Sequence, residues 1–156
     1  MNERRLSRAK RLDNREWVTG YYVFQPKRKG AFGQTMTEHD ADRHLICSRR
    51  NGEAYEIDPA TLGQCTSLKD KNGTLIYEGD IVSAKDLEDN DDFVGVIKWY
   101  GDYGFTAFSI CKADDWIRTH GKSPMRMFAS LEQPDYCYEV IGNIFDNPEL
   151  LGGDDA

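Results

Sequence analysis

Residues 64–82, QCTSLKDKNGTLIYEGDIV, constrain the fold of this chain more than any other stretch. Asn72 and Gly73 form the strongest short-range hairpin signal, because the two central residues of a type I′ turn both need positive φ. Apolar residues alternate after them, as a half-buried strand requires. Gly79 then interrupts the run before Ile81 and Val82. The stretch therefore predicts two hairpin strands, a corner and a third strand.

The rest of the chain carries the same pattern. Asn51 and Gly52 predict a second hairpin, between strands at 43–47 and 53–57, and a first hairpin is expected over 5–24. Further strands are expected at 93–100, 105–110 and 139–145, with a helical turn at 58–62 and a short helix at 113–120. We predict a mainly β fold: a β-hairpin subdomain at 1–63, an SH3-like, partly open barrel at 64–151 with an insert at 111–134, and a disordered tail at 152–156.

Four phrases of the sequence resemble those of the YopX family of phage and prophage proteins. They are SLKDKNGTLIYEGDIV at 67–82, YEVIGNIFDNPELL at 138–151, RAKRLDNREWVTGYYV at 8–23 and YEIDPATLGQ at 55–64. The resemblance implies a small β-rich protein with an SH3-like barrel and no defined biochemical role. It also implies structural roles for the motif residues Asp70, Asn72, Gly73, Tyr77, Glu78, Gly79, Asp80, Gly142, Asn143, Asn147 and Pro148.

Three positions depart from the family pattern. Ser67 and Arg15 stand where glycine is usual, and Cys65 stands where tyrosine is common. These departures concern local turn geometry and leave the resemblance intact.

The charge of the chain is uneven. The net charge is −7, yet residues 1–60 carry 12 Lys and Arg against 9 Asp and Glu, whereas residues 61–156 carry 8 against 18. An acidic protein is a poor non-specific ligand for nucleic acid, since phosphate neutralisation needs a basic surface. The basic start of the chain is the exception. It suggests either an arm that touches nucleic acid or an edge strand with exposed cations, and alternation favours the edge strand.

The cysteines Cys47, Cys65, Cys111 and Cys137 are too far apart in sequence for a CxxC metal knuckle, so we expect them to serve mainly as small core residues. The chain shows no secretory or membrane-spanning segment. We therefore expect a cytoplasmic protein of a bacterial host, with reduced thiols, no membrane association and no cofactor.

Catalytic patterns are weak. Glu78 and Asp80 could form an acid pair, but corner residues explain them better. His39 and His44 bracket carboxylates in a charged loop, and the acidic segment at 86–92 lacks the spacing of a calcium loop. Phosphate-loop, nucleophile-elbow and HExxH motifs do not occur. We predict no catalytic residue, no metal and no enzymatic activity.

The favoured function is a non-enzymatic, phage-encoded binding module that contacts an unknown protein through barrel loops and the insert. The alternative is a nucleic-acid accessory protein, and homo-oligomerisation through strand edges is a further hypothesis. The nucleic-acid alternative would use an aromatic hairpin tip and the basic arm. Its candidate residues are Trp99, Tyr100, Tyr103 and Phe105 with Lys98, and Arg8, Lys10 and Arg11.

Overall fold

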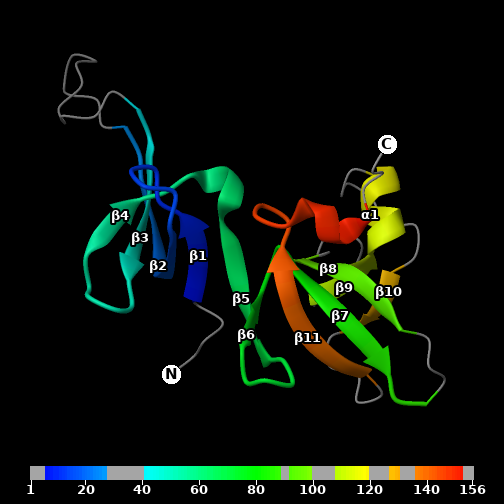
Figure 1. The fold of residues 1–156 in the computed structure, drawn as a ribbon. Coiled ribbons are helices and arrows are strands. Elements are labelled where there is room, and N and C mark those ends of the chain that lie inside the picture. Colours follow the sequence, from blue (N-terminus) through cyan, green and yellow to red (C-terminus); the bar gives the residue numbers. More distant parts are fainter. Residues whose placement is uncertain are drawn as a thin grey trace. The chain divides into compact units, whose positions relative to one another are not determined.

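The computed structural model describes residues 6–27, 41–88, 92–99, 108–119, 127–130 and 136–152. The chain divides into two compact units, Met1–Gln64 and Cys65–Ala156. Figure 1 shows that arrows, which are strands, make up most of both. The strands pair antiparallel throughout the described ladders, which confirms the predicted mainly β fold.

The first unit is an antiparallel sheet in the order β4-β3-β2-β1, and β1 also pairs with the start of β5. Ala9, Val18, Ile46 and Ile57 form its buried core. Because β1 has a neighbour on each side, the predicted edge position of this basic segment is wrong. The strands are β1 (Leu6–Lys10), β2 (Trp17–Gln25), β3 (Arg43–Ser48), β4 (Ala54–Glu56) and β5 (Gly63–Lys69).

Both Asn-Gly hairpins form as predicted, but the turn at Asn72-Gly73 differs from the predicted type I′. Gly73 has a φ of 80° and Gly52 a φ of 75°, whereas neither preceding asparagine has positive φ. The N–H of Gly73 donates to the carbonyl of Asp70 at 3.0 Å. The loop after β5 is therefore a turn closed by one left-handed glycine, a common three-residue connection, and not type I′.

The second unit contains a five-stranded antiparallel sheet in the order β10-β9-β8-β7-β11. In the described ladders β10 and β11 each have one neighbour, so the sheet does not close into a barrel. Ile76, Val82, Ala84, Ile97 and Ile110 are buried together in its core. Its elements are β6 (Leu75–Tyr77), which pairs with the end of β5, β7 (Asp80–Asp86), β8 (Phe93–Trp99), β9 (Phe108–Lys112), α1 (Ala113–Thr119), β10 (Met127–Ser130) and β11 (Tyr136–Asn143).

The described part of the predicted insert contains more regular structure than the sequence suggested. Its helix, α1, forms as expected, but β10 was not predicted; it arises by pairing with β9. The last strand begins and ends earlier than predicted, because residues 144–146 turn instead of continuing the ladder. The predicted turn at 101–104 and residues 153–156 of the predicted tail lie outside the described residues.

Among the described residues, two single-turn 3-10 helices also occur, η2 (Pro59–Thr61) and η4 (Pro148–Leu151). The side chain of Asp58 caps η2 by accepting from the N–H of Ala60 at 3.1 Å, as the Asp-Pro sequence predicts. In the described part of the chain, no helix has the length and apolar character needed to cross a membrane.

Candidate binding site

The two carboxylates of the Glu-Gly-Asp corner bond to backbone. Asp80 is 1% exposed, and its Oδ2 accepts from the N–H of Tyr77 at 2.8 Å. Glu78 Oε2 accepts from the N–H of Trp99 at 3.2 Å. Gly79 between them has a φ of 91°, a conformation that favours glycine. The geometry agrees with corner residues, because each carboxylate accepts a hydrogen bond from a backbone N–H.

Asp70 joins the central hairpin to the last strand. Its Oδ1 accepts from the N–H groups of Asn72 and Thr74, each at 2.9 Å, and its Oδ2 accepts from the N–H of Val140 at 2.9 Å. Burial acts to raise the pKa of this carboxyl, but the three backbone hydrogen bonds together hold the pKa below its ordinary value of 3.8. The carboxylate therefore acts as a structural tie.

The C-terminal motif builds a second tight turn. Asn143 Oδ1 accepts from the N–H of Phe145 at 3.0 Å and of Asp146 at 2.9 Å. A Cβ on Gly142 would lie 2.6 Å from Asn147 Oδ1, so the side chain of Asn147 needs glycine there. Pro148 then begins η4. The family-motif residues thus shape the backbone of the second unit.

The two residues that stand where the family usually has glycine, Arg15 and Ser67, both adopt a positive φ. Arg15 has a φ of 61° and Ser67 a φ of 64°, and they are the two non-glycine residues with positive φ in the described chain. Each therefore holds a left-handed conformation that glycine adopts without steric cost. This explains why glycine suits both positions.

The predicted aromatic hairpin tip is only partly described. Trp99 lies at the end of β8 and is 42% exposed. The Nζ of Lys98 lies 5.4 Å from the ring centroid of Trp116 in α1. The candidates Tyr100, Tyr103 and Phe105 lie outside the described residues. Of this candidate tip, the structure therefore describes Trp99 and Lys98 alone.

The predicted basic arm is part of the sheet of the first unit. Arg8 and Lys10 lie on β1 beside Trp17, with 4.9 Å from the Arg8 guanidinium and 5.5 Å from the Lys10 ammonium to the indole centroid. Arg11 follows β1, and its guanidinium stacks on the ring of Tyr55 at 3.9 Å. The three cations are thus fixed next to aromatic rings that the sequence analysis did not associate with them.

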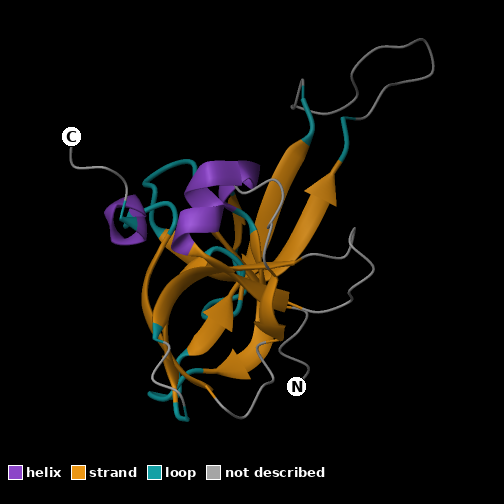
Figure 2. Ribbon diagram, turned by 90° about the vertical axis from the view of Figure 1, so that its right-hand side faces the viewer, coloured by secondary structure: helices purple, strands orange, loops and turns teal. Residues whose placement is uncertain are grey.

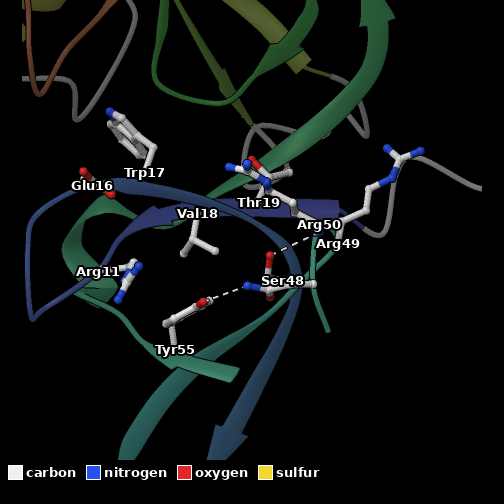
Figure 3. Close-up of a pocket in the computed structure, with 10 residues that line it drawn as sticks. Arg11, Glu16, Trp17, Val18, Thr19, Ser48, Arg49, Arg50 and Tyr55 are labelled. Carbon is white, nitrogen blue, oxygen red and sulfur yellow. Dashed lines mark hydrogen bonds between the residues drawn. The ribbon is translucent and has the colours of Figure 1, made fainter. Parts of the chain in front are cut away.

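Arg11, Trp17 and Tyr55, but not Arg8 or Lys10, line a pocket of about 590 Å³ within the first unit. Figure 3 shows its lining: Arg11 and Tyr55 on one side, Trp17 and Thr19 along β2, and Arg49 and Arg50 on the turn after β3. Sequence reasoning missed Trp17, Tyr55, Arg49 and Arg50. The adjacent arginines just before the Asn51-Gly52 turn were the available signal.

The second candidate surface is the outer part of the β2–β3 hairpin, which we call the ribbon: residues 21–25 of β2 and residues 43–44 of β3. β1 pairs with β2 only as far as Tyr21, and β4 pairs with β3 only from Leu45 onward. Figure 2 shows two strands that extend beyond the rest of the sheet. The ribbon exposes Tyr21 by 40%, Tyr22 by 38%, Val23 by 38% and Phe24 by 47%.

His44 belongs to this ribbon. Its Nδ1 lies 2.6 Å from the hydroxyl of Tyr22, with the two rings stacked, and the ring of Phe24 lies 5.2 Å away. Among the described residues, no group of three or more His, Cys, Asp or Glu side chains has the arrangement of a metal site. His39 lies outside them. Cys65 and Cys111 are buried thiols, and Cys47 and Cys137 are partly buried.

The fold defines a mainly β protein with two antiparallel sheets, in which the buried carboxylates of Asp70 and Asp80 and the half-buried amide of Asn143 hold the turns. This chain belongs to the YopX family: the family model described as YopX protein matches residues 8–152. No curated protein matches the chain significantly.

Proposed function

We propose that this YopX-family protein is a non-enzymatic binding module that recognises a protein partner through the ribbon. The exposed run of aromatic and aliphatic side chains at residues 21–24 is the observation that carries this proposal. The sequence analysis expected the partner to bind the barrel loops and the insert; we now propose that it binds the ribbon, in the first unit. The family resemblance supports a phage or prophage origin and action in the cytoplasm of a bacterial host.

Burial of the ribbon by a partner would stabilise it. A two-stranded hairpin is marginal by itself in water, because two strands bury little apolar surface. Contiguous exposed apolar surface on a soluble protein commonly marks an interaction site. Tyr22 and Phe24 fall on the same side of β2 as the core residue Val18, so the apolar face of the sheet continues past its covered part. A protein strand or loop laid on this face would bury it.

The absence of catalysis is part of the proposal and rests on how the carboxylates are used. Asp70 and Asp80 are buried and accept hydrogen bonds from backbone N–H groups. A general acid or base needs access to substrate and a pKa near the working pH. The lowered pKa of Asp70 suits a structural carboxylate better than a general base at neutral pH.

Site-specific photo-crosslinking in cells tests the protein contact. The probe p-benzoylphenylalanine replaces Phe24, and a matched variant carries it at Leu87, which is 67% exposed in the second unit. We expect a discrete protein adduct from position 24, weakened by Tyr22→Ser, and none from position 87. An adduct of two copies of this chain would identify the partner as a second copy. Identical adduct patterns from both positions would refute the proposal.

A further inference from the structure

The pocket of the first unit has one wall that is fixed before any ligand arrives. Arg11 Nε donates to Asp13 Oδ1 at 2.9 Å, and the guanidinium is stacked on Tyr55. The Tyr55 hydroxyl donates to Glu53 Oε2 at 2.7 Å and accepts from Asn51 Nδ2 at 2.9 Å. Because these groups are already hydrogen-bonded, binding against them requires little ordering of side chains.

The opposite rim of the pocket carries Arg49 and Arg50, whose side chains are exposed. The N–H of Arg49 donates to the carbonyl of Thr19 at 2.9 Å, and the N–H of Arg50 donates to Ser48 Oγ at 3.2 Å. The backbone of this turn is therefore pinned to the sheet. Both side chains are exposed, and no described carboxylate forms an ion pair with either guanidinium. They are available to an incoming anion.

Trp17 adds a flat surface on the same face of β2 as Thr19, opposite the face of Val18 (Figure 3). It is among the residues that line the pocket, and Arg8 and Lys10 lie within 5.5 Å of its ring centroid. Guanidinium groups match phosphate in a bidentate geometry, and an indole offers a stacking surface to any base. An acidic peptide without aromatic or aliphatic side chains would use the arginines but would gain nothing from the aromatic ring. The combination favours a ligand with both phosphates and exposed bases.

We propose that this pocket binds single-stranded nucleic acid, with Arg49 and Arg50 on the phosphates and Trp17 against a base. The site goes beyond the protein contact proposed above and uses different residues from the ribbon. A volume of about 590 Å³ lies within the usual range for small-ligand pockets and accommodates a nucleotide. A duplex keeps its bases stacked inside and would lose the indole contact. With two phosphates neutralised, log K should fall with log salt at a slope of about −1.4.

Fluorescence anisotropy with a labelled single strand of about ten nucleotides tests the site on the full chain at low salt. Arg49→Gln with Arg50→Gln should weaken binding about tenfold or more and flatten the salt slope. The control removes the same charge elsewhere: Lys69→Gln with Lys85→Gln changes two exposed lysines of β5 and β7 and should leave affinity within about twofold. Equal weakening by both pairs would mean that only net charge matters, and would overturn the proposal.

The aromatic part is tested separately. Trp17→Leu should weaken binding about tenfold, whereas Trp99→Leu, at the tip considered from sequence, should leave it unchanged. Thermal melting checks that each variant is folded, and the exposed arginine pair keeps the test valid if Trp17→Leu is not. Phe24→Ser should leave the affinity unchanged, which separates this site from the ribbon. No binding at low salt, equal affinity for duplex, or displacement of the strand by polyglutamate would each overturn the proposal.

Discussion

The two units of this protein use their charged residues in opposite ways. The first carries the excess of Lys and Arg; Arg8, Lys10 and Arg11 lie beside aromatic rings, and Arg49 and Arg50 lie on an exposed turn. The second carries the excess of Asp and Glu, and the carboxylates of its family motif bind backbone N–H groups. Asp70, Glu78 and Asp80, the carboxylates of the central motif, thus serve the fold of the second unit.

The difference teaches where sequence motifs and binding surfaces coincide and where they do not. The strongest motifs, at 67–82 and 138–151, meet in the second unit, where the Lys71 N–H donates to the Tyr138 carbonyl at 2.9 Å. Their residues specify turns. The pocket and the ribbon lie in the first unit. The phrases at 8–23 and 55–64 contain Arg11, Trp17 and Tyr55 of the pocket and residues 21–23 of the ribbon, whereas Arg49 and Arg50 lie outside all four phrases. Variation at Arg49 and Arg50 can therefore change what the pocket binds while leaving the four phrases intact.

The largest expected effect would come from placing a Cβ at Gly20 or Gly95. A Cβ at Gly20 would overlap the carbonyl oxygen of Cys47 in the first unit, and one at Gly95 would lie 2.8 Å from the carbonyl oxygen of Cys111 in the second. Each Gly→Ala change should cost about 3 kcal/mol, because a strand backbone cannot move aside. Hydrogen exchange should rise in the mutated unit alone. A rise throughout the chain would mean that the units unfold as one.

Removing the Asp80 carboxylate should be the next most costly change. Asp80→Ala leaves the buried N–H of Tyr77 without its acceptor and should lower the free energy of unfolding by about 2 to 3 kcal/mol. Glu78→Gln keeps an acceptor for Trp99 and should cost less than about 1 kcal/mol. Urea denaturation measures both. Equal effects of the two substitutions would contradict a structural role specific to Asp80.

Acid should weaken the second unit through Asp70. Because the pKa of Asp70 is lower in the folded chain than in the unfolded chain, its contribution is complete above about pH 4 and is lost as pH falls through the folded pKa. Asp70→Asn should cost about 2 kcal/mol at pH 7 and remove part of the acid dependence. Urea midpoints at several pH values below 5 measure this. A variant as acid-sensitive as the parent chain would show that other carboxylates dominate.

The smallest expected effect is a gain in stability. Ser67→Gly in the second unit relieves a positive φ and should raise the free energy of unfolding by about 1 kcal/mol. Arg15→Gly in the first unit relieves the same conformation but removes the ion pair with Asp58, 3.0 Å long, so its gain should be smaller. Thermal melting compares them. A loss of stability in Ser67→Gly would show that the hydroxyl contributes more than the backbone strain costs.

Much of the local structure was predictable. The Asn-Gly pairs located two hairpins, the Asp58-Pro59 pair located η2, and helical spacing of Trp116 and Ile117 located α1. The turn type was wrong because φ at an asparagine depends on loop length as well as identity. β10 was missed because a four-residue strand has too little alternation to detect, and only pairing with β9 creates it.

The candidate sites were harder to predict. The basic segment was placed at an edge, because alternation shows which faces a strand presents but not how many neighbours it has. Its second neighbour, β5, begins more than fifty residues later, with Ser7 opposite Gln64. The pocket likewise collects Arg11, Trp17, Arg49 and Tyr55 from separate strands and turns, and no spacing in the sequence marks them as a group.

The sequence by itself determined which residues alternate, where the chain reverses and which family it belongs to, because those properties depend on neighbours along the chain. The tertiary structure decided which strands pair and which polar groups are occupied. Asp70 shows why. Its carboxylate accepts a hydrogen bond from the N–H of Val140, seventy residues away, and that bond exists only after the sheet has formed.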